Sequence, residues 1–328
     1  MHNRADLLSR LLATLRAQTT PFTEIIVIDN ASTDGAPDLA RRHNCRIIAL
    51  TQNKGFAHAV NLGWRAADTE WVAILNSDVE LDPHWNETLL GNAMNFTFAT
   101  GLILDATNRD FIDGTYDLVA RSGCAWRAGA GEYASASDTK SIAIAPATAC
   151  LFRTHALRQL GGFDETYRSY LEDVDLGLRC LRAGFSGIYV PEAKAWHHGS
   201  ATLGRWNPRV VRLISRNQLL LVARNYDRRL FYSCLATIVV GQLLWGLVAL
   251  RHGAGVAWIA GKWEGLRAFR LDATPSPRLR EFLNASEQEI RNRATGSYWR
   301  WYFRLTSSAP APSPVLPVTR RDTNSEAP

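Results

Sequence analysis

The chain has 328 residues, of which 46% are apolar and 21% charged, a balance that is typical of folded proteins and excludes a disordered chain. The formal net charge of +6 is mildly basic, but no basic run or RNA-binding motif accompanies it, so we expect no nucleic-acid partner. Anionic substrates and anionic lipid headgroups account for this charge equally well.

The five cysteines are scattered and never spaced as C-x-x-C, which argues against a disulfide framework or a zinc site. A reducing compartment fits this pattern best. The N-terminal sequence Met1-His2-Asn3-Arg4 lacks the apolar stretch of a secretory signal. We therefore expect the protein on the cytoplasmic side of the membrane.

Up to residue 205, short apolar runs alternate with helical patterns. This alternation predicts an α/β domain, a mostly parallel sheet flanked by helices. Five leucines at helical spacing predict an amphipathic helix at the start. The expected elements, in chain order, are a helix over 6–18, strands over 24–28 and 47–50, a helix including 61–67, and a strand over Trp71–Leu75.

Residues 102–144 are interrupted often by Gly and Ser, and the pattern assigns no element there. Beyond them, residues 176–183 predict a helix that ends at Gly184. A short strand is expected over 188–190, stopped by Pro191.

A helical appendage is expected over residues 206–270, and its segment 230–250 contains no charged side chain. That length allows a membrane span, but a single span would carry further arginines across the membrane, against the positive-inside tendency. Two interpretations stay open. The helix lies in the membrane interface, with tryptophans at headgroup depth, or it is a buried helix of a helical subdomain.

The remaining chain divides into an amphipathic helical segment over 271–306, with a helix over Pro277–Arg293, and a tail over 307–328. The tail is rich in Pro, Ser and Ala, which predicts disorder. The predicted domain organisation is therefore a catalytic domain over 1–205, a helical segment over 206–270 that could associate with a membrane, the amphipathic helical segment 271–306 and the tail 307–328.

Polar residues follow the strand 24–28 directly, beginning with Asp29 and Asn30. Ligands of open α/β sheets bind at the carboxyl ends of strands, where an acid can accept hydrogen bonds from a nucleobase or ribose. Taken alone, however, this loop is explained better as a turn and a helix cap, because Asn30, Ser32 and Asp34 favour such positions by themselves.

A second carboxylate, Asp78, follows the strand Trp71–Leu75 in the sequence Asn76-Ser77-Asp78. A phosphate-bound Mg²⁺ or Mn²⁺ needs hard oxygen ligands, often only one or two carboxylates from the protein. Asp78 suits that role, and a polar turn explains it equally well until a partner residue is found.

Three acids, Glu172, Asp173 and Asp175, occupy four positions directly before the predicted helix. Such clustering costs repulsion, so it needs a reason. Capping of the helix N-terminus is one reason and a general base is another. We favour the general base, because a histidine pair, His197 and His198, follows the next strand and imidazole is a good ligand for Mn²⁺.

In this order, the motifs resemble the family 2 glycosyltransferases with the GT-A fold, a Rossmann-like α/β fold, and especially their bacterial rhamnosyltransferase-like branch. The resemblance covers residues 3–205. The matching segments are the nucleotide-contacting loop 28–35, the donor-side segment 53–57 with Asn61 and Gly63, the D-x-D position 75–78, the acceptor-side segments 161–165 and 172–176, and the strand 191–197.

The resemblance implies a metal-dependent inverting transferase. Asp29 would contact the base of a UDP- or dTDP-sugar, while Asp78 and His197 would hold Mg²⁺ or Mn²⁺ on the diphosphate. Asp173 would deprotonate the acceptor hydroxyl, which attacks the anomeric carbon opposite the diphosphate, and Glu172 would help to position the acceptor. The other implied donor-binding residues are Asn30, Asn53, Gly55, Asn61, Asn76 and Ser77, and Trp196 is a further acceptor-binding residue.

The implied function is transfer of a sugar, with rhamnose as a candidate, to a saccharide or polyprenyl-linked acceptor in cell-surface polysaccharide synthesis. The expected location is the inner face of the plasma membrane. The alternative is a catalytically impaired relative that binds a nucleotide-sugar or glycan. We set aside a dinucleotide-dependent oxidoreductase, because no G-x-G-x-x-G follows a strand.

The chain departs from the family pattern in two places. The D-x-D position reads Asn76-Ser77-Asp78, so one carboxylate is certain. The family's first apolar strand is missing, because Met1-His2 stands directly before the matching Asn3. Losing a central strand leaves backbone groups of its neighbours unpaired, so we expect a start codon assigned too late.

Overall fold

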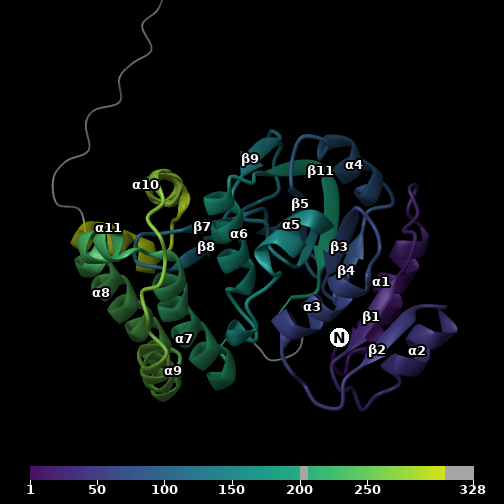
Figure 1. Cartoon of the computed structure of the whole chain (residues 1–328), viewed down its shortest axis with the longest axis horizontal. Coiled ribbons are helices and arrows are strands. Elements are labelled where there is room, and N and C mark those ends of the chain that lie inside the picture. Colours follow the sequence, from purple (N-terminus) through teal and green to yellow (C-terminus); the bar gives the residue numbers. More distant parts are fainter. Residues whose placement is uncertain (200–205, 307–328) are drawn as a thin grey trace, which may run out of the picture.

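The computed structural model of the chain describes residues 1–199 and 206–306. A strand-rich part, which holds the N-terminus, lies beside a group of helices (Figure 1). The tail predicted to be disordered, residues 307–328, lies outside the described residues.

The first ninety residues alternate helices and strands, as their apolar patterns predict. The leucines of the first helix are all buried against the strands beside it, so its apolar stripe faces the core. The elements in order are α1 (Ala5–Arg16), β1 (Ile26–Asp29), α2 (Ala36–Arg42), β2 (Arg46–Ala49), α3 (Phe56–Ala66), β3 (Trp71–Leu75), β4 (Val79–Leu81) and α4 (Trp85–Asn92).

The region over 102–144, which the sequence left unassigned, consists mainly of short strands. Four of them have three residues each, too few for a side-chain alternation to show. The elements here and after it are β5 (Phe98–Asp105), β6 (Ile112–Gly114), β7 (Asp117–Val119), β8 (Ala125–Arg127), β9 (Lys140–Ile142), β10 (Ala149–Arg153), α5 (Thr154–Leu160), a 3₁₀ turn (Glu165–Tyr167), α6 (Glu172–Ala183) and β11 (Gly187–His197).

The main sheet has the strand order β3-β10-β5-β11-β4, with β6 added to β5 and β9 to β11. The α/β architecture agrees with the prediction, but the pairing is less parallel than expected. β5 and β11 are parallel, whereas β10 runs antiparallel to both β3 and β5. Four of the five residues of β10 are buried, and a uniformly buried apolar run carries no information about strand direction.

The prediction that Pro191 ends a short strand is wrong. β11 runs on to His197, and its register with β5 shifts between Val190 and Lys194. An irregularity of this kind accommodates proline, which has no N–H to donate to a neighbouring strand. The continuation carries His197 to the site described below.

β1 and β2 form a separate parallel pair. Among the described residues, no strand pairs with the edge of β1 that faces β3, nor with the corresponding edge of β3.

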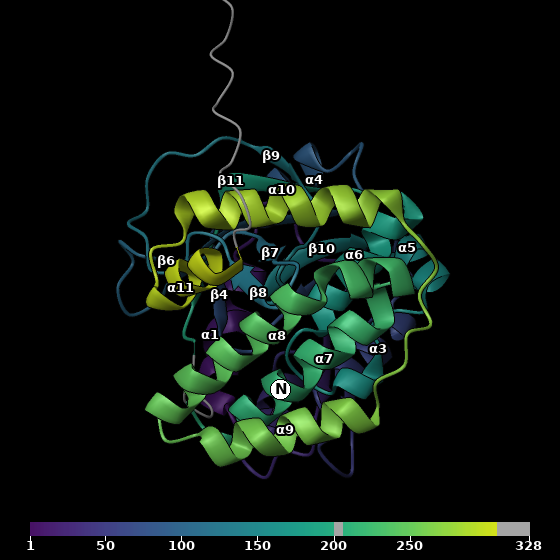
Figure 2. The ribbon, with the colours of Figure 1, turned by 90° about the vertical axis from the view of Figure 1, so that its left-hand side faces the viewer.

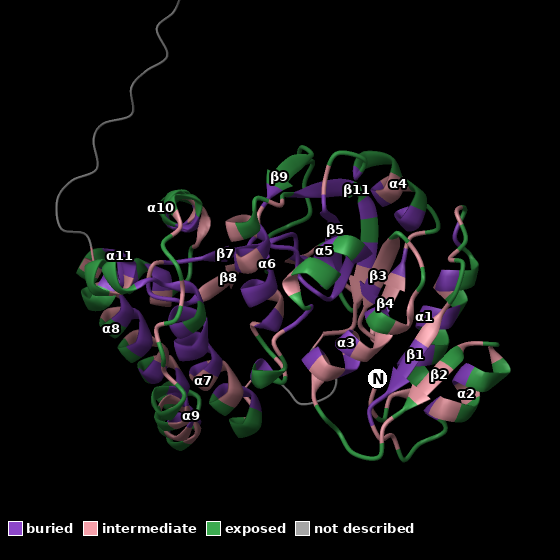
Figure 3. Ribbon diagram, in the orientation of Figure 1, coloured by how far each residue is buried: buried purple, intermediate pink, exposed green. Residues whose placement is uncertain are grey.

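The second part of the molecule is helical. Its elements are α7 (Pro208–Asn225), α8 (Arg228–Arg251), α9 (Gly255–Arg267), α10 (Pro277–Arg293) and α11 (Ser297–Thr306). α7 lies behind α8 and α9 when this side faces the viewer (Figure 2). Buried residues concentrate on the sheet and on α6 and α7, while α8 and α9 carry exposed residues on their outer faces (Figure 3).

Candidate active site

His197 joins two carboxylates at the end of the main sheet. It is the last residue of β11, and its partner in β4 is Val79. Val79 directly follows Asp78 in the chain. Its Nε2 atom is 3.4 Å from Oδ1 of Asp78, and its Nδ1 atom is 3.0 Å from Oδ2 of Asp113. The backbone also fixes this arrangement, because the N–H of His198 donates to the carbonyl of Asp78 at 2.9 Å.

These contacts make a mutually stabilised cluster of charges. Burial alone would lower the pKa of His197, but its hydrogen bonds to Asp113 and Asp78 raise that pKa to about 9. Burial alone would raise the pKa values of Asp78 and Asp113, and the hydrogen bond and charge of His197 lower both. At neutral pH the imidazole is therefore protonated and both acids are ionised.

Sequence reasoning missed Asp113. It lies in the three-residue strand β6, which pairs with β5, in the region where no element could be assigned. The available signal was weak: an acid between Ile112 and Gly114 looks like any polar turn. Pairing with β5 places it beside the end of β11.

Arg127 connects this cluster to the acids of α6. From β8 its guanidinium binds Asp117 through two contacts of 3.1 and 3.4 Å. It also lies 3.9 Å from Oδ2 of Asp113 and 3.9 Å from Oδ2 of Asp173. Burial would lower the pKa of Arg127, but the charge and hydrogen bonds of Asp117 raise it, so Arg127 stays a cation among three carboxylates.

Asp173 lies in the first turn of α6, where backbone groups hold its carboxylate. The N–H of Ala147 donates to Oδ2 at 3.1 Å, and the N–H of Val174 donates to Oδ1 at 2.9 Å. The side chain is 16% exposed, so it is anchored and still open to a substrate. Asp78, His197 and Asp173, far apart in the chain, are thus brought into one connected cluster.

The two acids beside Asp173 have different surroundings. Glu172 is 5% exposed, and its Oε2 atom has no hydrogen-bond partner among the described residues. Burial raises the pKa of Glu172 well above its usual value, which favours the neutral carboxylic acid. Asp175 is 1% exposed and binds Arg179 at 2.7 Å and Asn225 at 2.9 Å, which ties α6 to α7.

The predicted donor-side residues form one loop assembly. Asn30, after β1, accepts from the N–H of Lys54 at 2.8 Å and donates to the carbonyl of Gly55 at 3.1 Å. Asn53 accepts from the N–H of Gly55 at 3.0 Å. Gly55 has φ +94°, and a Cβ atom there would lie 2.7 Å from the carbonyl oxygen of Arg168, so glycine is required.

Asp29 and Asn61 are both buried. Asp29 accepts from the N–H of Ser32 at 3.0 Å. Asn61 is 1% exposed, and its amide bonds to Phe163, Glu165 and Trp64. This placement favours a supporting role for Asn61, holding α3 to the acceptor-side segment.

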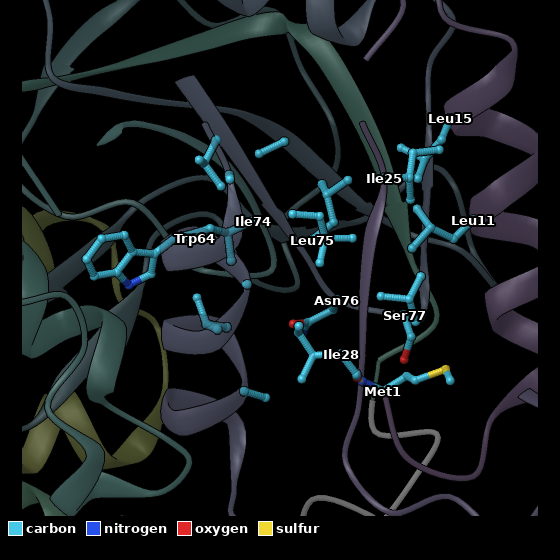
Figure 4. A pocket seen from close by; sticks show the side chains of 18 of the residues that line it. Met1, Leu11, Leu15, Ile25, Ile28, Trp64, Ile74, Leu75, Asn76 and Ser77 are labelled. Atoms are coloured by element: carbon cyan, nitrogen blue, oxygen red, sulfur yellow. The ribbon is translucent and has the colours of Figure 1, made fainter. Parts of the chain in front are cut away.

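A cavity of about 730 Å³ lies between α1, β1, β3 and α3. Asn76 and Ser77 line one end of it, near Met1 and Ile28, and most of the other lining side chains are apolar (Figure 4). Asn30, Asn53, Gly55 and Asp78 also contribute to its wall. The predicted donor residues and the candidate cation ligand therefore share one hollow.

Trp196, the other predicted acceptor residue, is partly covered. The guanidinium of Arg109 lies 4.8 Å from the centre of its ring. His198 does not join the cluster around His197, because its Nε2 atom pairs with Glu80 at 2.7 Å.

Comparison with known proteins identifies the family. Residues 1–161 match the family described as Glycosyl transferase family 2. The chain is 31% identical over 228 residues to N-acetylglucosaminyl-diphospho-decaprenol L-rhamnosyltransferase of Mycobacterium tuberculosis (strain H37Rv), covering 60% of this chain and 74% of that relative.

The chain is a family 2 glycosyltransferase.

Two solved glycosyltransferases share its fold. One is a mannosyltransferase from Pyrobaculum calidifontis, solved with GDP-Man and Mn²⁺, which is 17% identical and has a TM-score of 0.52. The match covers 93% of this chain and 83% of the mannosyltransferase chain. The other is GalNAc-T7, solved with UDP, GalNAc and Mn²⁺, which is 12% identical and has a TM-score of 0.58. The match covers 91% of this chain and 53% of the GalNAc-T7 chain.

The predicted GT-A fold and the predicted class of activity are therefore confirmed. Membership of family 2 implies an enzyme that transfers a sugar with inversion at the anomeric carbon. The alternative of an impaired binding relative gains no support from these similarities.

Proposed function

We propose that this family 2 glycosyltransferase transfers L-rhamnose from a UDP- or dTDP-sugar to a saccharide carried on a polyprenyl diphosphate. The observation that supports this most strongly is the connected cluster of Asp78, His197, Asp113, Arg127 and Asp173. The sugar and the lipid carrier are proposed from the M. tuberculosis relative, whose name specifies both.

In this proposal Asp173 is the general base. Its two backbone hydrogen bonds fix the orientation of the carboxylate, so it would present one fixed face to the acceptor hydroxyl. Burial favours the neutral form of Glu172, and in that form it would donate a hydrogen bond to the acceptor or to a neighbouring group without adding negative charge beside the base. Trp196, under Arg109, would offer an aromatic surface to the acceptor.

The donor would lie over the loop of Asn30 and Gly55, with its base near Asp29 and its diphosphate directed to Asp78. Asn53, Asn76 and Ser77 complete the polar end of the cavity. Because the loop is closed by its own hydrogen bonds before any ligand arrives, little ordering is required when the donor binds.

A divalent cation fits this set of side chains. In residues 1–199 and 206–306 no three His, Cys, Asp or Glu side chains form a site able to hold a metal ion by themselves. Mg²⁺ commonly takes one or two carboxylates and completes its shell with substrate phosphates. Asp78 and the neutral imidazole of His197 would hold the ion, which would displace the proton from Nε2 while Nδ1–H still donates to Asp113, and the ion's charge would favour departure of the diphosphate.

We also propose that α8 and α9 lie on a membrane surface. Within the described part of the chain, α8 is the one helix long and apolar enough to span a membrane. Only 33% of its most apolar 18-residue stretch is buried inside the protein. Its outward side chains Leu243 and Leu247 are 55% and 61% exposed, and Trp263 of α9 is 56% exposed. Exposed arginines at the ends of both helices would contact anionic headgroups.

The activity is tested with a panel of UDP- and dTDP-sugars and a short polyprenyl diphosphate-linked N-acetylglucosamine, with and without Mn²⁺. We expect transfer of rhamnose that is lost on chelation of the metal and restored by Mn²⁺. Transfer of a different sugar would overturn the choice of rhamnose. Full activity in the presence of chelator would overturn the proposed dependence on a divalent cation.

The membrane contact is tested by sedimentation with vesicles that contain anionic lipid. Leu243→Glu combined with Leu247→Glu should weaken binding at least roughly tenfold, because two apolar contacts are lost and two negative charges are added. Met94→Glu, at a residue 71% exposed outside the helical part, is the matched control. Equal binding of the double variant and the wild type would contradict the proposal.

A further inference from the structure

The segment that joins the 3₁₀ turn to α6 has a strained backbone. Arg168, Tyr170 and Leu171 have φ values of +63°, +72° and +68°, a region that residues other than glycine rarely adopt. At Arg168, where ψ is −67°, the N–H of Ser169 donates to the carbonyl of Tyr167 at 2.8 Å. This is a γ-turn of the rare form with positive φ. Such a conformation persists only where the surrounding structure holds it.

Asn217 of α7 holds this strained segment, residues 168–171, from one side. Its Nδ2 atom lies 3.0, 2.9 and 2.7 Å from the carbonyl oxygens of Tyr167, Ser169 and Tyr170. One side-chain amide therefore serves three backbone acceptors. Asn217 is 0% exposed, so water does not replace these hydrogen bonds when the amide is removed.

The surroundings of α7 fix the orientation of this amide. α7 lies beside α6 (Figure 2). Arg216 donates to Oδ1 of Asn217 at 2.9 Å and to the carbonyl of Thr166 at 2.7 Å. A Cβ atom on Gly265 of α9 would lie 3.0 Å from the carbonyl oxygen of Arg216, so α9 packs closely against α7 here. The side chain of Asn217 is thus held at a fixed place beside the strained segment.

The other side of the strained segment contacts the donor side of the site. The N–H of Ala57 donates to the carbonyl of Arg168 at 2.9 Å, and the N–H of Phe56 donates to Oγ of Ser169 at 3.2 Å. At its end the segment leads directly into α6, whose second residue is Asp173. The strained segment therefore connects the start of α3, which follows the donor loop, to the proposed base.

We propose that Asn217 is a positioning residue for sugar transfer, which fixes Asp173 relative to the donor loop by holding segment 168–171 in its strained conformation. This inference rests on the proposed function, in which Asp173 is the base. Without the amide, three carbonyls lose their donor, the segment relaxes towards negative φ, and the start of α6 rotates. The donor loop keeps its own hydrogen bonds through Asn30 and Asn53, so donor binding persists.

The test measures single-turnover transfer, donor affinity by calorimetry and thermal unfolding for full-length variants. Asn217→Ala should slow transfer roughly 30- to 100-fold, while the Kd of the donor changes less than about threefold. Arg216→Met, at a partly buried residue that supports the amide, should slow transfer roughly three- to tenfold. This milder variant decides the question if Asn217→Ala does not fold. Wild-type transfer by the folded variants would overturn the proposal.

Asn225→Ala is the matched control. Asn225 also belongs to α7, is 1% exposed, and donates to Asp175 and to the carbonyl of Leu221, but it does not contact the strained segment. The control should lower Tm while transfer stays within about threefold of the wild type. Equal slowing by Asn225→Ala and Asn217→Ala would overturn the proposal, because the packing of α6 on α7 in general would then set the rate.

Glycine at position 168 tests the role of strain. Glycine adopts positive φ without a steric cost, and the side chain of Arg168 is exposed. Arg168→Gly added to Asn217→Ala should therefore recover at least about threefold of the lost rate. No recovery would mean that Asn217 does not act by opposing strain in this segment, which would overturn the proposal.

A double-mutant cycle with Asp173→Asn separates this inference from the proposed function. If Asn217 acts through Asp173, Asn217→Ala should slow transfer by Asp173→Asn less than about threefold further. The same 30- to 100-fold slowing in both backgrounds would overturn the positioning role and leave Asp173 as the base. Transfer by Asp173→Asn at the wild-type rate would instead overturn the proposed base, and the positioning role with it.

Discussion

The guanidinium of Arg127 lies 3.9 Å from the carboxylate of Asp173, and the same group reaches Asp113 on its other side at the same distance. Through this contact the proposed base is linked to the proposed cation site. Since Asp113 also bonds to His197, one series of charged side chains connects the proposed base to the proposed cation ligands.

Replacing Arg127 tests this link. Arg127→Met leaves Asp113, Asp117 and Asp173 without their shared cation, so we expect a loss of about 3 kcal/mol in the free energy of unfolding. We also expect kcat to fall roughly 10- to 100-fold as Asp173 shifts. Stability is measured by denaturant unfolding and activity by steady-state transfer.

A second variant separates positioning from stability. In Arg127→Met combined with Asp117→Asn, the buried charge opposite Arg127 is removed as well, so stability should largely return while kcat stays low with little change in KM. Arg41→Met, at an exposed arginine of α2, is the control. Recovery of kcat together with stability would mean that Arg127 is only structural.

Asp113 is predicted to support the cation. In Asp113→Asn the hydrogen bond that orients His197 is weakened, so the Mn²⁺ concentration for half-maximal activity should rise roughly 10- to 100-fold. Asp110→Asn, at an exposed acid in the turn before β6, should leave this concentration unchanged. If both variants respond to Mn²⁺ like the wild type, Asp113 has no part in the site.

The donor loop depends on Gly55. A Cβ atom there would meet the Arg168 carbonyl, and φ +94° disfavours any other residue. Gly55→Ala should therefore destabilise the protein by roughly 1–3 kcal/mol and raise the donor KM. At Gly91 of α4, a Cβ atom would meet nothing within 4 Å, so Gly91→Ala is the control outside the donor loop. Equal donor KM values for the two variants would refute the role of this loop.

Lys262 makes stability depend on pH. Its ammonium group lies between α7 and α8, where it contacts Ser215, Gln218 and Gln242, and burial lowers its pKa to about 7. The unfolded chain, with the ordinary value of 10.5, binds more protons between these limits. The free energy of unfolding should therefore rise by on the order of 2–3 kcal/mol from pH 7 to pH 10.

Lys262→Met should be more stable than the wild type at pH 7, and the difference should shrink towards pH 10. Thermal unfolding at a series of pH values measures both curves. Parallel curves across this range would show that the lysine keeps its proton in the folded protein.

The order of motifs in the sequence was enough to predict the family, the fold and three of the clustered residues. Asp78, Asp173 and His197 each lie at the boundary of an element whose pattern is readable: the strand Trp71–Leu75, the helix α6 and the strand β11. Their meeting follows from the topology of the fold, not from their spacing in the chain.

Asp113 and Arg127 were beyond prediction for a physical reason. Both lie in three-residue strands, which are too short for an alternation of apolar and polar side chains to be recognised. Their neighbours in space depend on how these strands pair with other segments. The extension of β11 past Pro191 was missed because proline normally ends a strand, and only the register shift between Val190 and Lys194 allows it to continue.

The central claim is that Asp173 acts as the base, connected through Arg127 and Asp113 to the cation site of Asp78 and His197. The most direct measurement is single-turnover sugar transfer by Asp173→Asn beside donor binding by calorimetry in the same buffer. We predict that transfer slows about 10³-fold while donor affinity changes less than about threefold. Transfer within a few fold of the wild type, with the donor still bound, would contradict the account.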